Sequence, residues 1–133
     1  MFDESIVYDT GMNQVGYVEV VVPGKDSRVY RGYSPDGKMT GYVSYADTYL
    51  GTPPDGKLIG SLNVNKDGII YRLSPRPDGV SGYVPAPVGF LERKRDMDYV
   101  YRRIAPGKGQ LIGFVSGVED LFAAGGAALL LLL

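Results

Sequence analysis

The feature that most constrains the fold is a short pattern that recurs five times along the chain. Each unit begins with a tyrosine that follows a β-branched residue and ends with a glycine that precedes Tyr, Phe or, once, Ser. The five beginnings are Val7-Tyr8, Val29-Tyr30, Thr48-Tyr49, Ile70-Tyr71 and Val100-Tyr101. The five glycines are Gly16, Gly41, Gly60, Gly82 and Gly113. They follow the tyrosine by 8 residues in the first unit, 11 in the next three and 12 in the last. This near-constant spacing predicts a repeated supersecondary unit.

Each unit is predicted to be a strand, a turn and a second strand. Turn signals lie inside three of the units at Pro35-Asp36-Gly37, Pro54-Asp55-Gly56 and Pro77-Asp78-Gly79. Proline favours a φ of about −65° in such turns, and glycine permits a positive φ. The repetition therefore predicts an all-β fold of about ten short strands, arranged as β-hairpins around a pseudo-symmetric axis. A second way to pair the strands joins each glycine to the next tyrosine, which gives four hairpins and a half unit at each end.

The repeated glycines predict a crowded centre. Glycine inside a strand loses packing and conformational entropy, so it is expected where a bulge bends the strand or where another backbone or ring comes close. Equivalent glycines in every unit would then share one crowded point of the architecture. The aromatic residue that follows each glycine would lie on the opposite face of its strand.

The repetition of Val-Tyr, Asp-Gly and Gly-Tyr-Val, with a tail rich in Ala, Gly and Leu, resembles the small bacterial proteins known as four-fold β-flower proteins. The resemblance covers residues 7–133. It implies four β-hairpin petals around a pseudo-fourfold axis, and it implies no activity. Residues 85–98 are irregular and depart from the repeat, so the geometry of the last petal stays open.

Residues 117–133 are predicted to form an apolar helix beyond a hairpin domain of residues 1–116. Ser116 and Glu119 have the spacing of a capping box at the start of this helix. The 13 residues from Leu121 to Leu133 would measure about 20 Å as a helix, which is too short for a bilayer core of about 30 Å. A helix that is apolar on all sides is buried or lies in a membrane. We expect this one to pack on the hairpin domain or on a partner subunit.

Two groups of side chains are candidates for an interaction surface. One is the apolar face of the helix, and the other is a set of tyrosines that each precede an arginine in a strand. Neighbouring residues of a strand point to opposite faces, so either these tyrosines or the arginines face outward. Tyrosine suits binding because it combines a large area with a polar tip, although cross-strand packing is the favoured explanation of these tyrosines. The residues expected to form the surface are Leu121, Phe122, Leu129, Leu130, Tyr30, Tyr71 and Tyr101.

Composition removes most catalytic and metal chemistry. The chain has no cysteine and no histidine, and thus neither the commonest general base nor a thiolate nucleophile. Asn63-x-Asn65-x-Asp67-Gly68 matches the front half of a calcium loop, but Ser74 stands where a bidentate glutamate is needed. We interpret that segment as a hairpin turn. The sequence therefore predicts no enzyme, no cofactor and no metal site.

The remaining expectations concern location and partners. The formal net charge is −1, which gives no general attraction to nucleic acid. The first residues lack the basic and apolar segments of a signal peptide, so a cytoplasmic protein is expected. The predicted function is a non-enzymatic structural or protein-interaction module that self-associates through the apolar helix, as a homo-oligomer or with a protein partner. The alternatives are a peripheral membrane protein anchored by the leucine tail, and a small-ligand or carbohydrate-binding domain that uses exposed tyrosines.

Overall fold

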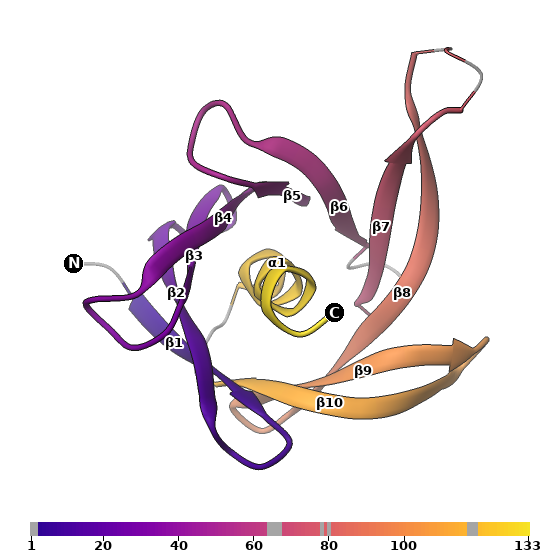
Figure 1. Cartoon of the computed structure of the whole chain (residues 1–133). Coiled ribbons are helices and arrows are strands. Elements are labelled where there is room, and N and C mark those ends of the chain that lie inside the picture. The colour runs from indigo at the N-terminus through magenta and orange to yellow at the C-terminus, as the bar shows by residue number, and fades with distance from the viewer. Residues whose placement is uncertain (1–2, 64–67, 78, 80, 117–119) are drawn as a thin grey trace.

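The part of the chain that the structure describes forms ten antiparallel strands and one helix. The structure is a computed structural model, and it describes residues 3–63, 68–77, 79, 81–116 and 120–133. The strands pair in the order β1-β10-β9-β8-β7-β6-β5-β4-β3-β2 and close into a barrel. The helix α1 stands at the centre of the ring of strands, as the end-on view in Figure 1 shows. The fold is therefore all-β with one C-terminal helix, as the repeat predicts.

Consecutive strands are neighbours in the barrel, so the chain is a simple meander that returns to its start. The elements are β1 (Asp3–Asp9), β2 (Gln14–Val22), β3 (Asp26–Arg31), β4 (Lys38–Ser44), β5 (Asp47–Leu50), β6 (Lys57–Asn63), β7 (Ile69–Pro75), β8 (Tyr83–Lys94), β9 (Met97–Ala105), β10 (Lys108–Ser116) and α1 (Leu121–Leu131).

The repeat units of the sequence are hairpins, which radiate from the axis in Figure 1. We call them petals, and the described strands form them as β1–β2, β3–β4, β5–β6, β7–β8 and β9–β10. Strand β10 pairs with β1, with Val7 opposite Val115, and this pairing joins the two half units that the second way of pairing leaves at the ends. The family resemblance implies four petals, whereas the described strands form five. Closure also pairs the edges that would otherwise invite aggregation.

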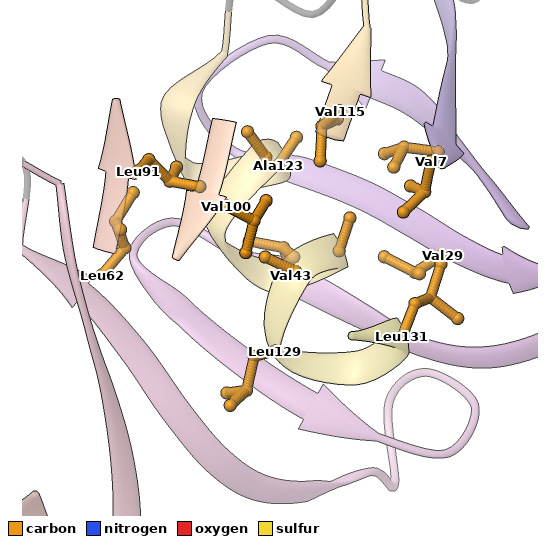
Figure 2. Packing of buried hydrophobic residues seen from close by; sticks show 14 of the residues in the cluster. Val7, Val29, Val43, Leu62, Leu91, Val100, Val115, Ala123, Leu129 and Leu131 are labelled. Atoms are coloured by element: carbon orange, nitrogen blue, oxygen red, sulfur yellow. The ribbon is translucent and has the colours of Figure 1, made fainter. Parts of the chain in front are cut away.

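Two residues from each petal form the inner wall of the barrel. Each is at most 6% exposed, and together they are Val7, Val18, Val29, Val43, Thr48, Leu62, Ile70, Leu91, Val100 and Val115. Small residues of α1 face this wall, and Ala123, Ala124, Ala127 and Ala128 are all fully buried (Figure 2). A Cβ added at Gly126 would overlap Cγ2 of Val43. Because a larger side chain would not fit between the helix and the wall, the Ala-Gly composition of α1 matches the space that the barrel leaves.

Five consecutive leucines at the end of the helical segment meet five strand glycines, one leucine to each petal. The pairs are Leu129 with Gly60, Leu130 with Gly41, Leu131 with Gly16, Leu132 with Gly113 and Leu133 with Gly89. Each glycine also lies against the backbone carbonyl oxygen of a tyrosine in the adjoining petal. Each follows one bulged residue that shifts the register by one. The predicted crowded centre is thus confirmed, and the helical rotation carries successive leucines around the axis from one petal to the next.

One of the glycines was predicted wrongly. Gly82 lies at a φ of +120° and the nearest atom to its added Cβ is Cδ of Arg76, so it is remote from the crowded centre. The equivalent residue is Gly89, which pairs with Ile70 in the same way that Gly41 pairs with Val29. The error has a physical source, because the β7–β8 petal is longer than the others and projects from the ring in Figure 1. Constant spacing therefore selected a glycine in the extension of this petal.

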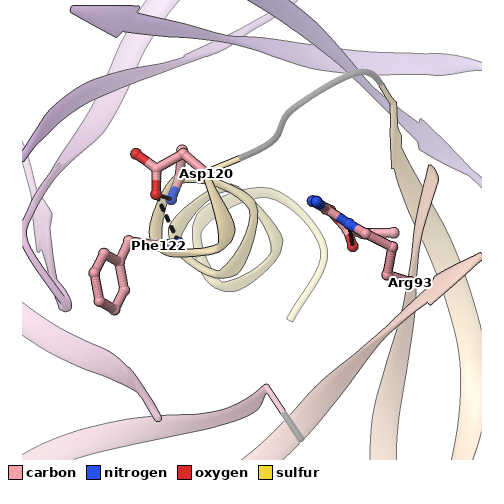
Figure 3. Close-up of polar contacts among 5 residues, drawn as sticks. Arg93, Asp120 and Phe122 are labelled. Carbon is pink, nitrogen blue, oxygen red and sulfur yellow. Dashed lines mark hydrogen bonds and ion pairs between the residues drawn. The ribbon is translucent and has the colours of Figure 1, made fainter. Parts of the chain in front are cut away.

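The start of α1 also differs from the predicted capping box. Ser116 ends β10, and its hydroxyl donates to the Ile6 carbonyl at 3.3 Å, while Glu119 lies outside the described residues. The N-cap is Asp120, whose Oδ1 accepts from the backbone N–H groups of Phe122 and Ala123 at 3.0 and 3.4 Å (Figure 3). Its Oδ2 accepts from the backbone N–H of Gly24 at 2.7 Å. One carboxylate thus caps the helix and holds it to the β2–β3 turn.

We expect Asp120→Ala to lower the free energy of unfolding by about 2 kcal/mol, since it removes a helix cap together with a bond between two elements. Asp120→Asn keeps an acceptor oxygen for the helix and is expected to cost less than half as much. Urea unfolding of the three proteins measures both values. Equal midpoints for the Ala variant and the unchanged protein would contradict the role of this side chain.

Candidate functional site

The tyrosines of the repeat lie on the outer face of the sheet, where neighbouring petals meet. In each petal the residue before the tyrosine points into the core, so the tyrosine itself points away from α1. It lies opposite the residue that follows the glycine of the adjoining petal. We call the space between these two side chains a crevice. The barrel therefore repeats one crevice at each meeting of petals.

In the described part of the chain, a stacked pair of aromatic rings fills each of three crevices, and the three pairs have similar distances and angles. Tyr17 and Tyr30 stack with centroids 4.8 Å apart and planes 10° from parallel. The pair Tyr42 and Tyr49 repeats this at 4.9 Å and 7°, and the pair Phe90 and Tyr101 at 5.0 Å and 14°.

The outer side of a filled crevice is closed by the turn of the next petal. The hydroxyl oxygens of Tyr17 and Tyr42 accept hydrogen bonds from the backbone N–H groups of Gly37 and Gly56, at 3.2 and 3.0 Å. A Cβ at either glycine would come within 2.5 Å of the tyrosine ring. The glycine turn therefore covers the tyrosine ring and leaves no room for a ligand in that crevice.

In a fourth crevice, between β10 and β1, the ring contact is made within one petal instead of across the crevice. Phe114 lies opposite Tyr8 in the register of β1 and β10, and its ring meets Tyr99 edge to face with centroids 4.9 Å apart. Aromatic residues thus stand on both sides of this crevice too.

The crevice between β6 and β7 lacks its second ring. Tyr71 lies here opposite Ser61, the one unit in which a small residue follows the glycine. A cleft of about 580 Å³ opens at this place, lined by Ala46, Asp47, Ser61, Leu62, Asn63, Tyr71, Pro85 and Phe122. We call it the Tyr71 cleft. Its size is in the range of small-molecule sites.

The walls of the Tyr71 cleft combine apolar surface with a few polar groups. Pro85 belongs to the longer β7–β8 petal, and Phe122 belongs to the first turn of α1, with its ring directed away from the helix axis in Figure 3. The polar groups come from Asp47, Ser61 and Asn63 on β5 and β6. Most of the lining is thus fixed on strands that the closed barrel holds in register.

The carboxylate of Asp47 influences its surroundings electrostatically. The pKa of the nearby Tyr49 hydroxyl is raised above its ordinary value, first by burial and then by the negative charge of Asp47. In the part of the chain that the structure describes, no ion pair with a Lys or Arg neutralises Asp47.

A second cleft lies on the other side of Tyr71. It measures about 440 Å³ and is lined by Ile69, Tyr71, Pro87, Gly89, Phe90, Arg103, Pro106 and Gly107. Tyr71 therefore separates two hollows of the outer face, one beside an acidic residue and the other beside a basic one.

The structure separates the residues that the sequence predicts for the interaction surface. Tyr30 and Tyr101 are stacked within filled crevices, and Leu129 is 3% exposed against Gly60. Leu121, Phe122 and Leu130 are partly buried against the core. Only Tyr71 and Phe122 meet in one cleft. Sequence reasoning missed Ser61 as a site residue, although the exchange of an aromatic residue for Ser after Gly60 was visible in the repeat.

The tyrosine–arginine pairs combine a tyrosine that packs on the outer face with an arginine that is exposed to solvent. Arg31, Arg72 and Arg102 are exposed, and Nη2 of Arg72 donates to the carbonyl oxygen of Leu133 at 3.3 Å. Asp98 is 1% exposed and accepts from Nε and Nη2 of Arg93 at 2.9 and 2.7 Å.

The described residues include no cluster of metal-binding side chains and no membrane-spanning helix. No group of three or more acidic residues there is placed to hold a metal ion. The segment that resembles part of a calcium loop has its residues 64–67 outside the described part of the chain. Within the described part, no helix has both the length and the apolar character needed to cross a bilayer.

Comparisons of the chain with protein-family models, with curated proteins and with solved structures find no match.

Proposed function

We propose that this protein is a non-enzymatic binding module whose small ligand occupies the Tyr71 cleft. The barrel would act as the scaffold, and Tyr71 would supply the main contact surface. This develops the alternative of a small-ligand or carbohydrate-binding domain that uses exposed tyrosines, with the difference that one tyrosine rather than several is open to a ligand.

One observation carries the proposal: Ser61 stands opposite Tyr71 where the other four crevices have an aromatic residue. A ring opposite Tyr71 would gain the apolar contact that Tyr17 gains from Tyr30. The smaller Ser61 side chain leaves this surface to another molecule. The cleft also has the mixture of apolar walls and a few polar groups that is typical of ligand sites.

The position of α1 bears on the other candidate functions. Its four alanines are fully buried inside the barrel of their own chain, so the helix has little surface left for a second copy. Self-association or membrane anchoring through α1 would require the helix to leave the barrel and expose the ten residues of the inner wall. The new contact with a second copy or a membrane would then have to offset the hydrophobic free energy lost by exposing the inner wall. We therefore favour a site on the outer face.

We expect Ser61→Tyr to close the cleft by supplying the missing ring. The new ring would stack on Tyr71, raising the free energy of unfolding by about 1 kcal/mol and removing ligand binding at the same time. Urea unfolding measures the first effect. Ser81→Tyr is the matched control, because it makes the same exchange at an exposed position and should change neither property.

Binding is measured by titrating the ¹⁵N-labelled full chain with phenol and indole and following its amide resonances. The amides of Ser61, Asn63 and Tyr71 should shift in the unchanged protein and in Ser81→Tyr, and stay in place in Ser61→Tyr. If phenol, indole and a methyl glycoside all leave these amides unmoved at millimolar concentration, the proposed function is wrong.

A further inference from the structure

The filled crevices define the shape of a molecule that would fit beside Tyr71. In each of the three stacked pairs, the second ring lies nearly parallel to the tyrosine, with planes 7° to 14° apart and centroids 4.8 to 5.0 Å apart. The same barrel geometry sets the relation of β6 to β7, since Ser61 lies opposite Tyr71 as Tyr17 lies opposite Tyr30. A flat ring is therefore the shape that would fit beside Tyr71.

The chemistry of the cleft selects among flat rings. The wall of the cleft opposite Tyr71 is formed on β5 and β6 and contains Asp47, Ser61 and Asn63. A carboxylate accepts hydrogen bonds and repels anions. Because no Lys or Arg forms an ion pair with Asp47 among the described residues, its charge remains available to a ligand. A donor or a positive charge on the ring would therefore be favoured.

We propose that the Tyr71 cleft binds a planar aromatic ring that carries an ammonium or other N–H donor, with the ring stacked on Tyr71 and the donor directed to Asp47. This rests on the proposed function and specifies its ligand class. Tyr71 supplies a ring face, which also attracts a cation nearby. Ser61 is a positioning residue here, because its small side chain leaves the ring space open.

Three probes of similar size test the ligand class. Tyramine has a phenol ring and an ammonium group, 4-hydroxyphenylacetate has the same ring with a carboxylate, and methyl β-D-glucopyranoside has a saturated ring without charge. Each is titrated into the ¹⁵N-labelled full chain at low ionic strength. We expect tyramine to bind about tenfold more tightly than 4-hydroxyphenylacetate, because Asp47 attracts the ammonium and repels the carboxylate, each by about threefold. The glucoside should leave the amides of Ser61 and Tyr71 unmoved.

Asp47→Asn separates the contribution of charge from that of the ring. It removes the negative charge while keeping a side chain of the same size, so tyramine and 4-hydroxyphenylacetate should then bind within about twofold of each other. The urea midpoint of this variant provides a check on folding, and Asp36→Asn is a matched control at an exposed turn that should retain the tenfold preference. Raising the salt concentration should reduce the preference in the unchanged protein.

The outcomes distinguish this inference from the proposed function. Binding of the glucoside in preference to both phenols would leave a ligand-binding module but overturn the aromatic class. Equal affinity for tyramine and 4-hydroxyphenylacetate in the unchanged protein would overturn the role of Asp47. Absence of binding by all three probes, together with phenol and indole, would overturn the proposed function itself.

Discussion

Gly41→Ala is expected to lower the free energy of unfolding by about 3 kcal/mol, because the added methyl group has no space on either side. It would overlap the backbone carbonyl oxygen of Tyr49 and lie 2.8 Å from both methyl carbons of Leu130. A flexible side chain can move away at small cost, but the carbonyl belongs to the hydrogen-bonded strand β5. Overpacking against a backbone group therefore forces a shift of the strand, and such shifts cost at the upper end of the usual range.

Two further variants make this prediction specific. Gly11→Ala adds the same methyl group in the exposed β1–β2 turn, where the nearest atoms belong to the polar ends of Asn13 and Asp9, and it should change the urea midpoint little. Gly41→Ala combined with Leu130→Ala removes the leucine but leaves the carbonyl in place, so it should not recover stability. Full recovery in the double variant would mean that the leucine alone, and not the adjoining petal, makes the centre crowded.

A chain that ends at Ser116 is expected not to fold into the barrel. Removal of α1 would leave the ten apolar or β-branched residues of the inner wall around an empty space. A void of this kind loses both the hydrophobic contribution and the dispersion contacts of the wall. The lost contacts include four fully buried alanines and Leu129 at 3% exposure, and their contribution is of the same order as the typical total stability of about 5–15 kcal/mol.

Circular dichroism and thermal unfolding test this expectation directly. The shortened chain should lack the cooperative transition of the full chain, and its tyrosine signals in the near ultraviolet should disappear because the stacked pairs are no longer held. Tyr33→Ser changes an aromatic residue that is 67% exposed and should keep the transition. A shortened chain that melts cooperatively at the temperature of the full chain would show that the barrel is stable without its central helix.

Much of the architecture follows from the local sequence pattern. The alternation of β-branched and tyrosine residues fixes which side chains enter the core, because side chains of a strand alternate between its faces. Val29 and Tyr30 illustrate this, with the first fully buried and the second stacked outside. The recurrence of the pattern was also sufficient to predict hairpins and a crowded axis, since glycine weakens a strand unless a bulge or a close approach of another group requires it.

The fourth petal shows where counting along the chain fails. Gly82 satisfied the spacing, whereas Gly89 satisfies the three-dimensional requirement of lying against both Leu133 and the Tyr101 carbonyl. A loop or hairpin end on the surface can lengthen at small cost, because closure entropy rises slowly with length. The pairing near the axis cannot shift, since a one-residue slip would turn the core side chains outward.

The sequence by itself determined the local elements of this protein: strands with one apolar face, turns at the proline–glycine segments and an apolar helix that must be buried. Those properties arise from interactions between residues close in the chain. Only the tertiary structure decided that β10 returns to β1, that α1 enters the barrel of its own chain and that one leucine meets each petal. Closure of the barrel and burial of the helix inside it depend on contacts between residues that are remote in sequence. For the same reason, the Ser that replaces an aromatic residue at position 61 produces a cleft only because the neighbouring petals surround it.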